Sequence, residues 1–135
     1  MNPIKLSFLL LFCALAAQGQ LVVTISPMKI TGQKAILPLA MTNNLAGPVE
    51  SARAVCFLLD DQGRMVGQST KWVISGGKDR PALQPNAGTI FNFVITSPQP
   101  FATTNLTAKV SFSRVILPGH KLANPQTDVK IQTAN

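Results

Sequence analysis

Residues able to carry out catalysis or bind a metal ion are few in this sequence of 135 residues. His120 is the single histidine, and it follows Pro118-Gly119 in a segment with the composition of a turn. As a general base it would need a carboxylate to orient its ring, and only Asp128 lies near it in the sequence. A zinc site needs three or four nitrogen or sulfur ligands. We therefore predict no catalytic residue, no metal site and no cofactor, and we interpret His120 as a surface residue.

Two adjacent carboxylates and one cysteine each have a structural and a chemical interpretation. Glycoside hydrolysis needs two carboxylates that face each other across the scissile bond, whereas Asp60 and Asp61 are neighbours followed by Gln62-Gly63. This composition predicts a tight hairpin turn, and it offers too few oxygen ligands for calcium. Cys56 lies in the apolar segment 54–59 and is predicted to be buried and inert. A reactive or dimer-forming thiol would instead require exposure and a basic neighbour.

The best candidates for ligand contact lie in and beside one predicted loop. Residues 75–85 include Gly76-Gly77 and Pro81, which interrupt regular structure. Between them stands a charged tip, Lys78-Asp79-Arg80, which we predict to be an exposed contact surface. Trp72 precedes the loop and is the other binding candidate, although a tryptophan in a strand can also serve as a core residue.

The chain is basic, with 12 Lys and Arg against 5 Asp and Glu and a net charge of +7, which loss of Lys5 with an export signal would lower by one. A basic surface attracts anionic partners such as acidic glycans or membrane headgroups. The sequence contains no run of basic residues and no basic helix, so we interpret these residues as solvated surface charge and expect no nucleic-acid partner. They are Lys29, Lys34, Arg53, Arg64, Lys71, Lys78, Arg80, Lys109, Arg114, Lys121 and Lys130.

The first 19 residues have the composition of a removable secretory signal. Lys5 supplies the positive region, residues 6–17 are apolar, and Ala17-Gln18-Gly19 presents small residues for a signal peptidase. Phe12 precedes Cys13 where a lipoprotein signal needs a small residue, so we predict cleavage rather than acylation. The mature chain, residues 20–135, contains no second apolar run able to span a bilayer. The expected location is therefore secreted or periplasmic.

The mature chain is predicted to be a single all-β domain. Seven strand-like segments alternate with turn residues and show no helical period, which is typical of an Ig-like antiparallel β-sandwich of about seven strands. Pro38 within the second segment predicts an edge position or a bulge. In the fourth, Trp72 and Ile74 are expected on one face, and in the sixth, Phe112 is expected to alternate with Ser111 and Ser113. The segments are 21–26, 35–42, 50–59, 64–74, 89–95, 106–117 and 127–133.

Three of these segments resemble a family of extracytoplasmic domains. An apolar strand that ends in Asp60-Asp61-Gln62-Gly63 and returns through Arg64-Met65-Val66 is similar to the central hairpin of bacterial FxLYD-like modules. The turn at residues 43–47 and the segment 83–91, with its leucine, proline, glycine and aromatic strand, also look similar. The resemblance covers roughly residues 30–95, although Leu59 replaces an aromatic residue. It implies an Ig-like accessory or adhesion domain without catalytic residues.

Together these features predict an exported, non-enzymatic binding or accessory module that recognises a protein or a glycan through loops or a sheet edge. The alternative is a structural domain that packs edge to edge in a larger complex. A third class is an enzyme with a site assisted by His120. The oligomeric state does not follow from the sequence.

Overall fold

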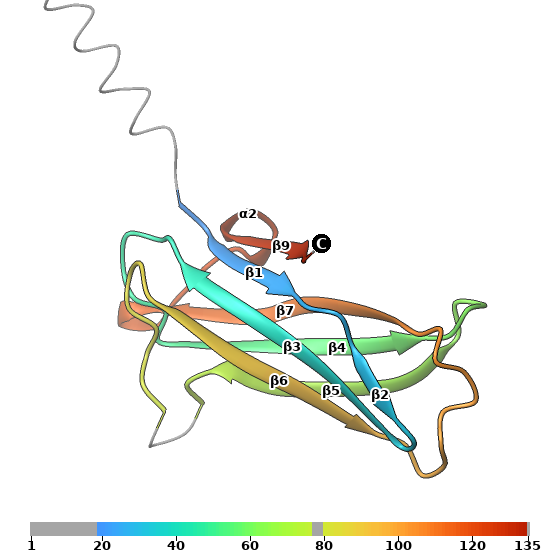
Figure 1. Cartoon of the computed structure of the whole chain (residues 1–135). Helices are drawn as coiled ribbons and strands as arrows, with labels where there is room; N and C mark the ends of the chain where they lie inside the picture. Colours follow the sequence, from blue (N-terminus) through green and yellow to red (C-terminus); the bar gives the residue numbers. More distant parts are fainter. Residues whose placement is uncertain (1–18, 77–79, 135) are drawn as a thin grey trace, which may run out of the picture.

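Short alternating segments form nine β-strands within residues 19–76 and 80–134, the part of the chain that the computed structural model describes (Figure 1). The predicted signal lies almost wholly outside these residues. None of the helices in the described ranges is long and apolar enough to cross a membrane. The strands are β1 (Leu21–Ile25), β2 (Lys29–Thr31), β3 (Lys34–Asn43), β4 (Ser51–Leu59), β5 (Met65–Ile74), β6 (Gly88–Thr96), β7 (Thr107–Leu117), β8 (Lys121–Leu122) and β9 (Val129–Thr133).

The strands build two sheets that pack face to face (Figure 1). One sheet has the order β2-β3-β1-β9, with β6 paired to the other side of β3, and the second has the order β5-β4-β7-β8. The prediction of an all-β sandwich is confirmed. The loops that follow β5 and β7 lie at one end of the sandwich, and the β4–β5 turn lies at the other (Figure 1).

The core between the sheets follows the alternation of the strands. Every second residue of β3 and β4 points inward, which places Leu39 and Leu58 in the core with no exposed surface. Phe93 of β6 is the largest fully buried side chain and packs edge to face on Phe91, with their ring centroids 5.3 Å apart. Burial of such side chains contributes about 25 cal/mol per Å² of apolar surface, and this supplies the driving force for folding.

Strand number and direction differ from the predicted arrangement in three places. Strands β2 and β8 have three and two residues, too few to show an alternation, and both were missed. Strand β9 runs parallel to β1, whereas an antiparallel sandwich was expected. It starts at Val129 because α2 (Pro125–Asp128) occupies the preceding residues, with the N–H of Gln126 donating to Asn124 Oδ1 at 3.0 Å.

Pro38 does not mark an edge strand, and the pairing with β6 has no bulge at this position, contrary to the prediction of one or the other. Strand β3 pairs with β1 and β2 on one side and with β6 on the other. Proline is tolerated there because its position faces the break between β1 and β2. The N–H of Ser26 donates to the Pro38 carbonyl at 3.1 Å, and the return bond that proline cannot make falls in that break.

Asn43 was expected in the turn at residues 43–47, but it is buried at the end of β3 and its side chain bonds to two segments. Its Nδ2 donates to the carbonyls of Gly47 at 3.0 Å and Leu83 at 2.9 Å. Its Oδ1 accepts from the N–H of Leu45 at 2.9 Å. The side chain therefore ties the β3–β4 connection to the segment before β6.

Candidate functional site

Three side chains stand next to one another across the outer face of the four-stranded sheet. Arg53 of β4 is paired in register with Trp72 of β5 on one side and with Arg114 of β7 on the other. The flanking Ala52 and Ala54 are buried, so Arg53 points away from the core. Cβ atoms of facing residues on adjacent strands lie roughly 5 Å apart. We call this set the Trp72–Arg53–Arg114 row.

The row is set by two β-bulges, one on each neighbour of Arg53. Val73 is an extra residue on β5, and Ser113 is an extra residue on β7. The first bulge turns Ile74 inward, where it is buried beside Ala52, although it was expected on the face of Trp72. The second brings Arg114 outward. Bulges re-aim side chains in this way and are concentrated beside functional sites.

Arg53 and Arg114 are both exposed and carry the same charge at directly opposed positions. Such an arrangement is unfavourable unless an anion balances it. Within residues 19–76 and 80–134 neither guanidinium has a carboxylate within 4 Å. Strands β4, β5 and β7 contain no Asp or Glu at all. The two arginines of the row are therefore a pair of positive charges that no described carboxylate binds directly.

Polar side chains border the two arginines. Thr70 and Ser113 line, together with Val55, a shallow hollow of about 390 Å³ beside Arg53 and Arg114. The Ser113 hydroxyl donates to the Arg53 carbonyl at 3.3 Å. Both hydroxyl oxygens can also accept hydrogen bonds, so this end of the row combines cationic donors with neutral hydroxyls.

Trp72 forms the other end of the row and is half-buried on the sheet surface. The backbone of Gly76, at φ +87°, lies against it so closely that a side chain at this position would collide with Trp72. No described residue accepts a hydrogen bond from the indole N–H. Trp72 also lines a second shallow hollow of about 530 Å³, whose other residues are Glu50, Ser51, Ser75, Gly76, Ile116 and His120.

Two residues around the Trp72 hollow have left-handed backbones that are unusual for residues with side chains. Ser75 has φ +54° and His120 has φ +59°. Strained positions of this kind are often found at functional sites. No ion pair joins His120 to Glu50 or Asp128 in the described ranges. Asp128 instead accepts a hydrogen bond from the N–H of Asn124 at 2.8 Å.

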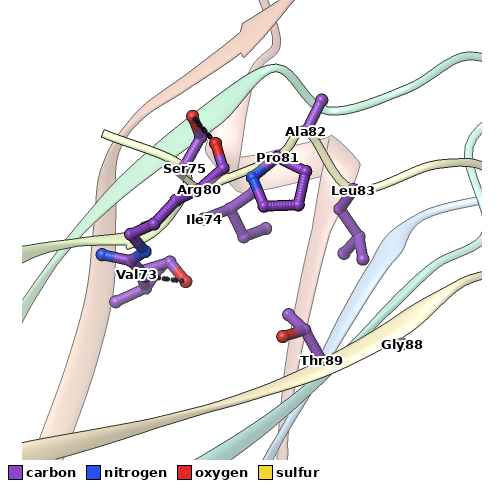
Figure 2. A pocket seen from close by; sticks show the side chains of 9 residues that line it. All are labelled: Val73, Ile74, Ser75, Arg80, Pro81, Ala82, Leu83, Gly88 and Thr89. Atoms are coloured by element: carbon purple, nitrogen blue, oxygen red, sulfur yellow. Dashed lines mark hydrogen bonds between the residues drawn. The ribbon is translucent and has the colours of Figure 1, made fainter. Parts of the chain in front are cut away.

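Arg80, predicted at the charged loop tip, is attached to the sandwich. Its Nη1 and Nη2 donate to the carbonyls of Trp72 at 3.2 Å and Val73 at 3.4 Å, and its guanidinium carbon lies 5.6 Å from the ring centroid of Phe91. Ser75 Oγ donates to the Arg80 carbonyl at 3.0 Å (Figure 2). These bonds hold the base of the loop against β5. The other two predicted tip residues, Lys78 and Asp79, lie outside the described residues.

The segment of Arg80 also borders a pocket of about 210 Å³ under the loop (Figure 2). Its walls include the buried side chains of Val73, Ile74 and Leu83, and Gly88 and Thr89 of β6 complete it. The polar side chains at this pocket are those of Ser75, Arg80 and Thr89. Because the side-chain bonds of Ser75 and Arg80 run to the backbone, we assign this pocket to the anchoring of the loop.

Asp60 closes the β4–β5 turn, as its sequence predicts. Its Oδ1 accepts from the N–H groups of Arg64 at 2.8 Å and Gln62 at 2.9 Å, and Arg64 Nε donates to Oδ2 at 3.0 Å. The Arg64 backbone N–H is the main cause of a lowered pKa for this carboxyl, assisted by the Gln62 N–H and the guanidinium of Arg64. Asp61 is exposed, and Gly63 has φ +78°. The carboxylate of Asp60 thus stabilises the β4–β5 turn.

Cys56 is buried in the core with no exposed surface. Burial raises the pKa of its thiol to about 11. A thiol with this pKa has little thiolate at neutral pH, and thiolate is the reactive form. In the described residues no group of three or more His, Cys, Asp or Glu side chains lies close enough to hold a metal ion.

Sequence reasoning missed Arg53 and Arg114 as a pair. They are far apart in the sequence, and the alternation around residues 108–113 gave no indication of the bulge that turns Arg114 outward. Arg53, however, shares the outward phase of β4 with Val55 and Phe57. A charged residue beginning such an apolar outer row could have been noted from the sequence.

Comparisons with known proteins support the fold and extend no further. No family model matches the chain, and no curated protein matches it. A crystal structure of a Bordetella pertussis protein designated ApaA is similar, with a TM-score of 0.52 and 11% sequence identity. The match covers 78% of this chain and 88% of that one. At this identity the likeness concerns the β-sandwich alone, and the resemblance to FxLYD-like modules stays a prediction.

Proposed function

We propose that this protein is an exported, non-enzymatic binding module whose contact surface is the Trp72–Arg53–Arg114 row with the adjoining loop 75–85. The observation that carries the proposal is the pair of bulges on both sides of Arg53. Two arginines and an aromatic ring thereby lie together on the outer face of the sheet, and no carboxylate of the described residues forms an ion pair with either arginine. Loops and faces of a rigid sandwich are common sites of recognition.

The chemistry of the surface supports binding better than catalysis. Arginine remains protonated at physiological pH and presents planar groups of donors, which suits recognition and not proton transfer. The one cysteine of the described chain is buried with a raised pKa. Asp60 and Asp128 are engaged by backbone N–H groups.

The tryptophan provides a direct test, because the sequence contains only one. Purified protein is titrated with separated polysaccharide, protein and lipid fractions of the host envelope, and the emission of each fraction alone is subtracted so that the fluorescence of Trp72 remains. We expect one fraction to shift the emission saturably and the double variant R53S/R114S to lose the response. Absence of a response to all three fractions would contradict the proposed surface.

Export is tested separately on the whole chain. Cell fractionation followed by amino-terminal sequencing is expected to find the protein outside the cytoplasm, with a new amino terminus close to Gln20. An intact amino terminus in the cytoplasm would refute the exported role, and an acylated Cys13 would replace it with a membrane-anchored one.

The assembly of copies edge to edge is a second candidate, favoured by strand β6. In the described sheet β6 pairs only with β3, and its outward residues Ile90 and Val94 are 69% and 44% exposed. An edge with exposed apolar residues can pair with another chain. Light scattering of the purified protein decides between the candidates. A defined oligomer that becomes monomeric in the variant I90K/V94K supports assembly, and a monomeric wild-type protein supports the binding module.

A further inference from the structure

The class of ligand can be inferred from the side chains that the row presents and from the backbone groups of β4 that are already paired. Strand β4 is hydrogen-bonded to β5 on one side and to β7 on the other, so its backbone has no free edge at Arg53. An extended peptide cannot add to the sheet there as a further strand. A peptide strand could add only at the outer edges of β5 and β7, beside the row, so a ligand that lies across Arg53 is bound by side chains.

The side chains of Arg53 and Arg114 suit a carboxylate or sulfate. A guanidinium binds such an anion through two parallel hydrogen bonds, which are among the strongest in proteins. Two guanidiniums on facing residues can share one anion, and the anion would relieve their mutual repulsion. No described acidic side chain competes for this position.

The Trp72 end suits a neutral ring. Its indole offers an apolar face and an N–H donor that no described residue uses. The residues that line its hollow include the acidic Glu50, which would repel an anion here and can accept a hydrogen bond from a hydroxyl. The row therefore has a polarity: a hydroxylated ring fits the tryptophan, and an acidic group fits the arginines.

The dimensions fit a short stretch of a sugar chain. The three residues span two strand spacings, roughly 10 Å. Shallow hollows of about 530 Å³ and 390 Å³ lie at the two ends, and the second is bordered by the hydroxyls of Thr70 and Ser113. Shallow surfaces lined by an aromatic ring, hydroxyls and planar donors match a ligand rich in hydroxyl groups.

We infer that the Trp72–Arg53–Arg114 row binds an acidic polysaccharide, with a sugar ring on Trp72 and its carboxylate or sulfate on the two arginines. This inference rests on the proposed function and specifies its ligand. The two anionic groups have the same recognition chemistry, so the experiment uses one polymer of each kind.

The test measures binding by Trp72 fluorescence and by calorimetry with four polymers: polygalacturonate for carboxylate, heparin for sulfate, dextran as a neutral glycan and poly-L-glutamate as an acidic peptide. We expect polygalacturonate or heparin to bind, more weakly as salt is added, and dextran and poly-L-glutamate to bind at least tenfold more weakly. R53S is expected to weaken binding about tenfold and R53S/R114S about a hundredfold, as for lost charge-assisted bonds.

Two further variants separate site chemistry from net charge. K29S/K130S removes the same charge from the other sheet and is expected to change binding less than threefold. R53K/R114K keeps the charge and loses the bidentate geometry, so it is expected to bind about tenfold more weakly. Circular dichroism confirms that every variant is folded before it is compared.

The outcomes distinguish the inference from the proposed function. Equal binding of poly-L-glutamate, equal binding of dextran, or equal losses in R53S/R114S and K29S/K130S would overturn the acidic polysaccharide as ligand. The binding module would then stand if an envelope fraction still shifted Trp72 emission. Failure of both acidic polysaccharides to bind also overturns the inference.

Discussion

The buried polar residues of this protein and its exposed arginine row satisfy their hydrogen-bonding and charge requirements in opposite ways. Asn43 and Asp60, the two buried polar side chains of the described chain, are bonded within the protein, Asn43 to the β3–β4 connection and to Leu83, and Asp60 to the turn that it begins. Arg53 and Arg114 instead face each other at the surface, and neither forms an ion pair with a carboxylate of the described residues. The former arrangement is complete within the protein, whereas the latter would be completed by a ligand.

This difference separates residues that hold the fold from residues available for function. Buried polar groups are costly unless they are bonded, and in the described chain no buried side-chain nitrogen or oxygen lacks a partner. A protein that satisfies its interior so completely can tolerate a local repulsion on its surface. The comparison therefore predicts large stability losses at Asn43 and Asp60 and almost none at Arg53.

Asn43 provides the largest expected effect. N43A removes three hydrogen bonds and leaves the carbonyls of Gly47 and Leu83 without this donor. We expect the free energy of unfolding in urea to fall by about 3 kcal/mol. The matched control is N44A at the exposed neighbour, for which a change of about 0.5 kcal/mol or less is expected. Equal losses of unfolding free energy in the two variants would show that the Asn43 side chain does not stabilise the fold.

Asp60 is expected to give a smaller, pH-dependent loss. The pKa of its carboxyl is lowered from the ordinary value of 3.8, so its charge stabilises the fold above that value, and the contribution is lost as the pH falls through the folded-state pKa. Thermal unfolding should show D60N less stable than wild type at neutral pH, with the gap shrinking below about pH 3.8. D61N, at an exposed position, should show no such dependence. A gap independent of pH would contradict the assignment.

Arg53 is expected to have the smallest effect. R53S relieves the repulsion with Arg114, so the free energy of unfolding should stay within about 0.5 kcal/mol of wild type or rise slightly. The control is R64S, which loses the ion pair with Asp60 and should be less stable than wild type. If R53S instead destabilised the protein as much as N43A does, the row would have a role in stability, contrary to the comparison.

The sequence was sufficient to predict the sandwich because apolar alternation and turn residues are local properties. All seven predicted segments contain a strand, and the Asp60 turn forms as its residues indicate. Pro38 and Asn43 were misjudged because their environments depend on segments far away in the chain. Proline faces a break between two other strands, and the asparagine is buried by loops around it.

The candidate site was less accessible to prediction for the same reason. A bulge changes which face a residue occupies, and it is defined by the register of the partner strand. Nothing local at Phe112-Ser113-Arg114 indicates that Arg114 joins Arg53 rather than Phe112. Trp72 and Arg80 could be selected from residue type and loop composition, but their distinct positions, one on the sheet face and one at the loop base, required the structure.

The pairing of β1 with β9 determines when the sheet can be completed during synthesis. In the described sheet the edge of β1 opposite β3 pairs with residues 129–133. During synthesis, residues 21–25 emerge long before that partner exists, so one flank of the first strand stays uncovered until more than a hundred further residues have followed. Completion of this sheet is therefore a late event in the synthesis of the chain.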